Sequence, residues 1–192
     1  MFFFRRPTAQ RIDRFRQMAT RETFSYPEVG ATLKGEIPER YNLDHNRVRL
    51  GEGAVTFERA SAALCEWKMF DIGWVELLHP RGPAGAGQTV LVLARTCGLY
   101  SLSASRVIGM IEDESGHVRR RGFSYGTLQH HVERGEERFS IEHDLKDDSV
   151  WYDILAFSVP QHPFARIAHP LSRAAQRRFA GDSKAAMLRA IF

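Results

Sequence analysis

Cysteine is scarce in this sequence, and its scarcity excludes several kinds of site. Only Cys65 and Cys97 occur among 192 residues, far apart and in no CxxC spacing. Two cysteines form neither a disulfide framework nor a complete structural zinc site. The eight histidines show no HExxH or HxH spacing either. We therefore expect no metal site and no cofactor, and we expect a reducing compartment, the cytoplasm.

Long apolar segments are missing as well. No stretch approaches the roughly 20 apolar residues that a membrane-spanning helix needs. The apolar residues 1–4 are followed, not preceded, by the positive charges of Arg5 and Arg6, unlike the order in a signal peptide. We expect neither export nor a membrane span. The sequence also contains no GK[ST] phosphate-binding motif and no GxSxG nucleophile elbow.

The composition that remains suits a folded domain with a mildly basic surface. Hydrophobic residues make up 43% of the chain and charged residues 26%, so a sizeable core can form. The net charge of +4 favours contact with anions. Basic residues at 119–121 and in the last helix could contact nucleic acid, but a solvated helix face has the same spacing. No basic motif interleaved with aromatic residues is present, so nucleic acid is not an expected partner.

Apolar periodicity predicts helices near both ends of the chain. Ile12, Phe15 and Met18 form one stripe of a helix at residues 7–20. An irregular linker follows at residues 26–41, so we expect residues 1–40 to pack as helix and linker on a domain formed by residues 41–192. Residues 55–70 are predicted as one helix and residues 171–191 as a long last helix.

The segments between these helices predict β-strands. The expected strands are residues 47–50, 74–78, 89–96, 99–112, 118–127, 136–144 and 150–158. Gly109 is expected at a bulge and Gly135 at a turn. Residues 89–96 are almost continuously apolar, so both faces of that strand should be covered. Strands this close in the chain form an antiparallel sheet, whose open face the last helix would cover. The predicted fold class is therefore α+β.

Several segments together resemble a known family. They are residues 41–51, 57–67, 125–128, 135–139, 151–152 and 177–180. Their combination is similar to the family called domain of unknown function nineteen-ninety, or uncharacterised protein family five-four-eight, of bacteria and plants. One departure is His130, which stands where the family pattern has a glycine before His131. The order of elements also resembles the helix-grip architecture of START and birch-pollen-allergen-like proteins. That resemblance implies a curved antiparallel sheet around a long C-terminal helix, with a cavity between them and here an additional N-terminal helix.

Alternation along the late strands predicts that polar groups enter this cavity. If Phe139 and Ile141 face the core, Glu137 and His143 share their face. The neighbouring strands would add Arg121, Phe123, Tyr125 and Thr127 on one side, and Trp151 and Asp153, with Leu155 and Phe157, on the other. An apolar face with such polar interruptions is typical of a ligand cavity. Alternatively, Glu137 and Asp153 form plain ion pairs with arginines such as Arg121 or Arg106, and both possibilities stay open.

Two further residues are candidates for chemistry. His131 could act as acid or base if a proton donor lies within hydrogen-bond reach, and otherwise it is a loop histidine bonded to the backbone. Arg47 could reach an anionic group of a ligand. The nearby Gly51 and Gly53 are more simply explained by a tight turn from strand to helix than by phosphate binding.

Three functions are compatible with these patterns. The first is the binding of a small apolar or amphipathic, lipid-like ligand in the cavity between sheet and C-terminal helix. The second is an enzyme of cyclase, dehydratase or hydrolase type, with Glu137 or His131 as acid or base and Tyr125 orienting the substrate, which predicts a shifted pKa in a cleft. The third, least favoured, is an anion or nucleic-acid binder that uses the basic ends of the chain.

Overall fold

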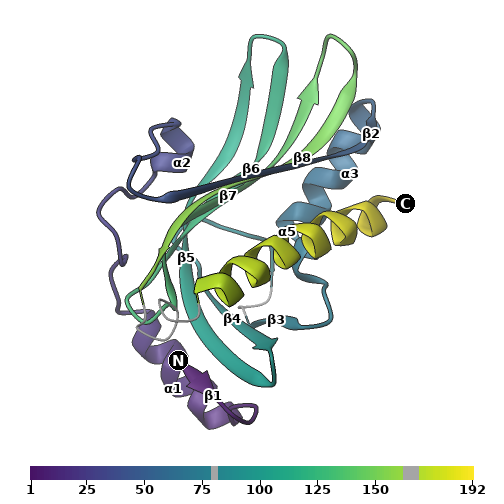
Figure 1. The fold of residues 1–192 in the computed structure, drawn as a ribbon. Helices are drawn as coiled ribbons and strands as arrows, with labels where there is room; N and C mark the ends of the chain where they lie inside the picture. Colours follow the sequence, from purple (N-terminus) through teal and green to yellow (C-terminus); the bar gives the residue numbers. More distant parts are fainter. Residues whose placement is uncertain (79–81, 162–168) are drawn as a thin grey trace.

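One curved antiparallel sheet dominates the fold (Figure 1). The computed structural model describes residues 1–78, 82–161 and 169–192. The strands are β1 (Phe2–Phe3), β2 (Asn42–Glu52), β3 (Val75–Leu78), β4 (Thr89–Thr96), β5 (Leu99–Ser115), β6 (Val118–Thr127), β7 (Glu133–Asp144) and β8 (Ser149–Pro160). The helices are α1 (Ala9–Ala19), α2 (Ala31–Lys34), α3 (Ala54–Cys65), the 3₁₀ helix η1 (Lys68–Phe70) and α5 (His169–Ile191).

The strand order is β2-β8-β7-β6-β5-β4-β3, with β1 paired to β5. The predicted α+β class, with a sheet around a C-terminal helix and an additional N-terminal helix, is confirmed. The predicted bulge is also present, because the register between β5 and β6 shifts between Val107 and Gly109. An extra residue at this point strengthens the local twist and helps the long β5 to curve.

The main hydrophobic core lies on the concave face of the sheet. In Figure 1 α5 crosses the hollow of the sheet, and α3 lies on the same side. Phe139 pairs with Phe123 on β6 and with Ile154 on β8, and antiparallel partners share a face. All three are buried there together with Phe57 of α3 and Met187 of α5. Each such side chain contributes about 1.5–3 kcal/mol by leaving water.

The helix predicted over residues 55–70 ends early, at Cys65, so that prediction was wrong at its C-terminal end. Trp67 adopts a left-handed backbone conformation, with φ of 62°, and the chain continues as η1. A straight helix would carry Met69 and Phe70 along its own axis, whereas the break turns both into the core beneath α5. Trp67 itself packs on Phe123, with ring centroids 4.6 Å apart.

The convex face of the sheet is also covered, by the N-terminal part of the chain. Ile12 and Phe15 of α1 pack on Leu91 and Leu102, while Val90 faces the concave core, so both faces of β4 are covered as predicted. Arg106 connects α1 to the sheet. Its guanidinium donates, over 2.9–3.1 Å, to the carbonyl oxygens of Ala19 and Thr20 at the end of the helix and of Glu22 just beyond it. The division into residues 1–40 and 41–192 stays a prediction.

Glu136 fastens the linker to the convex face. Its Oε2 accepts hydrogen bonds from Tyr26 Oη (2.8 Å) and the Gly30 amide (2.7 Å), and its Oε1 accepts one from the Thr32 amide (2.8 Å). The hydroxyls of Thr32 and Ser124 donate to the same Oε1. These donors replace the water that this buried carboxylate loses on folding. Successive side chains of a strand point to opposite faces, so the odd-numbered residues of β7, such as Glu137 and Phe139, face the concave side.

Candidate functional site

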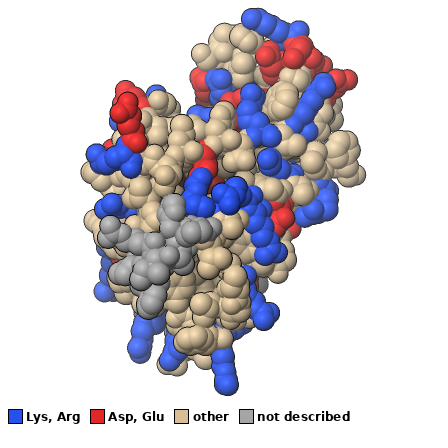
Figure 2. All heavy atoms as spheres, viewed as in Figure 1, with Lys and Arg blue, Asp and Glu red and all other residues tan. Residues whose placement is uncertain are grey.

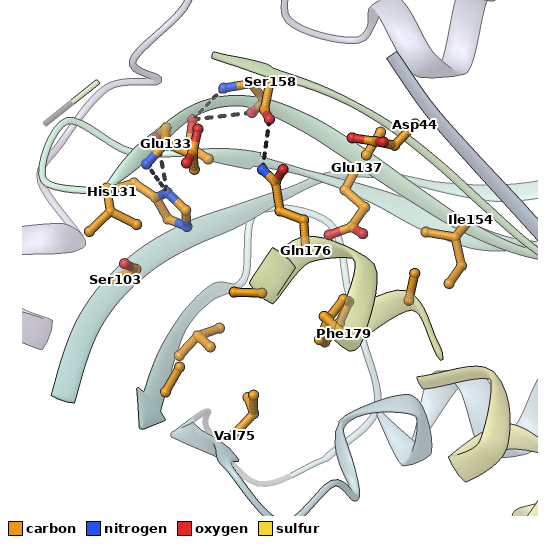
Figure 3. A pocket seen from close by; sticks show the side chains of 18 of the residues that line it. Asp44, Val75, Ser103, His131, Glu133, Glu137, Ile154, Ser158, Gln176 and Phe179 are labelled. Atoms are coloured by element: carbon orange, nitrogen blue, oxygen red, sulfur yellow. Dashed lines mark hydrogen bonds between the residues drawn. The ribbon is translucent and has the colours of Figure 1, made fainter. Parts of the chain in front are cut away.

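A cavity of about 250 Å³ lies between the concave face of the sheet and α5 (Figure 3). Its walls are mostly apolar and include Phe70 of η1, Val75 of β3, Val92 of β4, Ile154 of β8 and Phe179 of α5. An apolar cavity of about 150 Å³ takes up benzene, so this space is large enough for a substituted aromatic ring. It is slightly smaller than the pockets of about 300–1,000 Å³ that hold drug-sized ligands.

Glu137 brings a carboxyl group into this apolar space. Figure 3 shows its side chain pointing from β7 toward α5, between Gln176 and Ile154. Tyr125 on β6 is its cross-strand partner and donates a hydrogen bond of 2.8 Å to Oε2. Burial raises the pKa of Glu137 to about 7, although the Tyr125 hydroxyl favours the charged form; the charge of Asp44 adds to the rise. The carboxyl therefore changes charge near neutral pH.

A second polar pair lies where β7 begins. Burial raises the pKa of Glu133 to about 7 and lowers the pKa of His131 to about 4. The Glu133 amide lies 3.0 Å from His131 Nδ1 and donates to it, so the ring is held by the backbone, as the simpler prediction had it. The same ring also lines the cavity. At pH 7 this histidine is neutral, and the two glutamates are partly ionised.

Two polar contacts tie the start of α5 to the sheet beside the cavity. Arg173 binds Asp44 of β2 through both terminal nitrogens, with Nη2 2.6 Å from Oδ1. Gln176 donates to Ser158 Oγ of β8 over 3.1 Å. Arg173 is thus committed to Asp44, and the carboxyls of Glu133 and Glu137 have no ion-pair partner within 4.0 Å among the described residues.

Four of the predicted site residues line the cavity, namely Tyr125, Thr127, His131 and Glu137. Among them, Thr127 is fixed by its Oγ1, which accepts from the Gly135 amide over 2.9 Å. Glu137 lines this cavity and has no arginine partner among the described residues, so the plain ion pair considered for it is absent there. The ligand-binding roles of these residues stay predictions.

The prediction that Trp151, Asp153 and Phe157 face the concave side was wrong. Asp153 pairs in register with Ser140 and Arg47, one residue away from the position opposite Phe139. On the convex face, Asp153 binds Arg138 at 3.0 Å and Arg47 at 3.2 Å. Arg47 also stacks on the Trp151 ring, at 4.9 Å from its centroid. Arg47 is therefore engaged outside the cavity, and for Asp153 the ion-pair alternative holds.

The misplaced face has a clear cause in the sequence of β8. Both alternating sets of residues in this strand are apolar, Val150, Tyr152 and Ile154 in one set and Trp151, Leu155 and Phe157 in the other. Hydrophobicity alone cannot choose between them, since the N-terminal linker covers Phe157 on the convex side. Pairing with β7 decides the choice, because Ile154 lies opposite Phe139.

Three predicted residues face the concave side but do not line the cavity. The rings of Trp67 and Phe139 pack against Phe123 and fill the space beside it. His143 stacks on Phe57 of α3 and lies 2.7 Å from Asp148 Oδ1. Arg121 binds Glu58, also on α3. The helix α3 thus covers this end of the hollow, and the cavity is confined to the end beneath the first half of α5.

Glu133, Gln176 and Phe179 line the cavity but were not among the predicted site residues. Glu133 has the same parity as Glu137, but Gly135 was interpreted as a turn that ends the strand. In the structure Gly135 lies inside β7, and a Cβ atom there would come within 1.9 Å of the Phe157 carbonyl. Parity extended through Gly135 would have found Glu133, whereas nothing in the α5 sequence distinguishes Gln176.

Outside the cavity, the charge and metal-ligand patterns of the described part of the chain indicate no second site. Within the three described ranges, no group of three His, Cys, Asp or Glu side chains is placed to hold a metal ion. Figure 2 shows Lys and Arg side chains spread over the face that α5 crosses, several of them together near its middle. Some of these charges are paired, as Arg178 is with Asp182 at 3.3 Å. No described helix is both long enough and apolar enough to cross a membrane.

Sequence comparison finds relatives that match this chain along nearly its whole length. The model of a family described as "Domain of unknown function (DUF1990)" matches residues 25–186. A UPF0548 protein of Deinococcus radiodurans is 39% identical over 203 residues, which cover 99% of this chain and 98% of that protein. A UPF0548 protein of Dictyostelium discoideum is 34% identical over 208 residues, covering 100% and 96% of the two chains.

Solved structures are similar to this chain at low sequence identity. Hypothetical protein jhp0584 from Helicobacter pylori is 12% identical with a TM-score of 0.53, over 88% of this chain and 96% of that one. Ara h 8.0201 has a TM-score of 0.48 at 12% identity, over 79% and 96%. Human STARD10 has a TM-score of 0.41 at 11% identity, over 93% and 80%. The first of these likenesses supports the fold and carries no information on activity.

Proposed function

From the premise that this chain belongs to the DUF1990 family and has the helix-grip fold, we propose that it binds a small, mainly apolar molecule between the sheet and α5. The observation that carries the proposal is the cavity of about 250 Å³, whose apolar walls are interrupted by the Tyr125–Glu137 pair. Pockets of this kind, with a few convergent polar groups, are typical of small-molecule sites.

The placement of polar and apolar groups supports an amphipathic ligand. Phe179 and Ile154 flank Glu137, and Val75 lies on the far side of the hollow (Figure 3). An apolar body would release water from these walls, while a polar group would satisfy the carboxyl. The volume suits a molecule the size of a substituted ring better than a whole lipid.

The proposal is tested by titrating 2-phenylethanol into the full chain and following backbone amide shifts by NMR. We expect saturable shifts that concentrate at cavity residues such as Ile154 and Phe179. Two α5 variants sharpen the test, because Ala175 lines the cavity whereas its neighbour Ala174 is exposed. Ala175→Trp should fill the space and lower the affinity at least about tenfold, and Ala174→Trp should leave it unchanged.

The proposal would be overturned if the wild-type chain bound neither 2-phenylethanol nor amine or carboxylate analogues of the same size. It would be overturned equally if the folded Ala175→Trp variant bound 2-phenylethanol as tightly as Ala174→Trp does. Circular dichroism of both variants ensures that a lost signal reflects a filled cavity and not an unfolded chain.

A second candidate function, acid–base catalysis in the same cavity, is favoured by the pKa of Glu137. A value of about 7 suits a general acid or base at neutral pH, and the carboxyl lies in a largely apolar cleft. The test is a ¹³C NMR titration of the Glu137 carboxyl. Tyr125→Phe should raise the pKa further, since it removes the donor that favours the charged form. An ordinary pKa near 4.5 in the wild-type chain would eliminate this candidate.

A further inference from the structure

We propose that the ligand of this cavity carries a protonated amine, which binds the free oxygen of Glu137. This inference rests on the proposed function and specifies the chemical class of the ligand. It follows from the charges that the described residues place around the hollow and from the hydrogen bonds that are already made there.

The hydrogen bonding of Glu137 leaves one acceptor atom for a ligand. Oε2 accepts from the Tyr125 hydroxyl at 2.8 Å, which orients the carboxyl toward α5. Oε1 accepts no hydrogen bond from the described residues, and it is not among their fully buried unpartnered atoms, so it remains accessible. A carboxylate oxygen only accepts hydrogen bonds when ionised, so its complement is a donor. A buried charge also needs a charged partner to offset the water it has lost.

The charges facing the cavity favour a cation over an anion. Glu133 and Glu137 both line it, and neither has a basic partner within 4.0 Å in the described part of the chain. Arg173 approaches from α5 but binds Asp44 through both of its terminal nitrogens. Arg177 also lines the cavity, yet it is exposed to solvent, where its charge is screened. A carboxylate ligand would therefore meet two half-buried acids, of which only Glu133 is also influenced by the charge of Arg173.

The walls define the remainder of the ligand. Phe70 and Phe179 supply aromatic surface close to the carboxyl, and Val75 and Val92 supply aliphatic surface beyond it. An ammonium group bound to Glu137 would leave its apolar body against these side chains. The class is thus a small primary or secondary amine on an apolar, preferably aromatic, body.

Three probes of matched size test the inference: 2-phenylethylamine, 2-phenylethanol and 3-phenylpropanoate. Each is titrated into the full chain at one pH just above neutrality and followed by NMR. We expect the amine to bind about tenfold more tightly than the alcohol, because a charge-assisted hydrogen bond is roughly twice as strong as a neutral one. The carboxylate should bind most weakly.

Substitutions test whether the Glu137 carboxylate causes the preference for the amine. Glu137→Gln keeps an acceptor for Tyr125 but removes the charge, so the amine should lose its advantage over the alcohol. Glu112→Gln is the matched control, because its side chain is 81% exposed on β5, outside the cavity. Glu133→Gln provides a second folded variant and should reduce the advantage only in part.

The outcomes separate this inference from the function on which it rests. If none of the three probes binds, the proposed function itself is overturned. If the alcohol or the carboxylate binds as tightly as the amine, the cavity still takes a ligand and only the amine class is wrong. An amine advantage that survives Glu137→Gln would also overturn the assignment to this carboxyl.

Discussion

The carboxyl of Glu137 should make the stability of this protein depend on pH in a predictable way. Its pKa is about 7 in the folded chain because of burial, against an ordinary value of 4.5. A group whose folded-state pKa is raised contributes stability that is complete below the unfolded value and is lost as pH rises through the folded value. The free energy of unfolding should therefore fall between about pH 4.5 and about pH 7 on account of this residue.

The size of the effect follows from the same two values. A tenfold difference in proton affinity is about 1.4 kcal/mol, so a rise from 4.5 to about 7 corresponds to roughly 3 kcal/mol. Because the carboxyl is partly exposed to the cavity, solvent screening reduces this to about 2 kcal/mol. Glutamine has no proton to lose, and its side-chain oxygen still accepts from Tyr125. Glu137→Gln should therefore gain about 2 kcal/mol relative to wild type between about pH 5 and about pH 8.

Urea unfolding followed by tryptophan fluorescence measures this difference. The free energies of unfolding of wild type, Glu137→Gln and the exposed control Glu112→Gln are compared at about pH 5 and about pH 8. Glu133 is present in all three proteins, so its contribution cancels in the comparison. Glu112→Gln should show the same dependence on pH as wild type. If Glu137→Gln shows the same dependence on pH as wild type, burial does not raise the pKa of Glu137, and the reasoning is refuted.

Other substitutions test positions outside the cavity, on the convex face and on α5. Glu136→Gln should lower the free energy of unfolding by about 3 kcal/mol, because an amide NH₂ would face N–H and O–H donors; a loss below about 1 kcal/mol in urea unfolding would contradict this. Gly126→Ala should cost about 2 kcal/mol, since the new Cβ would lie 2.1 Å from Tyr26 Oη, and an unchanged melting temperature would show that the ring moves freely. Gly181→Ala, in open space on α5, should instead stabilise the chain by about 0.5–1 kcal/mol in the same melting assay. Arg106→Ala should speed amide hydrogen exchange in α1, because the Ala19 carbonyl at its end would lose a charged donor, and unaltered exchange would refute that role.

Much of the fold was readable from local patterns. β1 and α2 were not predicted, and β2 was predicted only over residues 47–50. The stripe of α1 and the other strand segments were predicted within a few residues, and Gly109 was expected at its bulge. These features depend on neighbours in the chain, through side-chain period and glycine chemistry. The same alternation placed Tyr125 and Glu137 on one face, because the convex-facing residues between Glu137 and Ile141 are polar.

The errors in the sheet have one physical origin, which is that both of its faces are covered. In β8 two apolar sets compete for the concave side, and only pairing with β7 gives that side to Ile154 and sends Asp153 to Arg138. Gly135 was predicted as a turn, but it lies inside β7, where the Phe157 carbonyl leaves no room for a Cβ atom. Local sequence thus determined most of the elements, their order and the side that Glu137 faces. Only the tertiary structure decided where α3 fills the hollow and where α5 leaves it open, since that depends on how helices distant in sequence pack against the sheet.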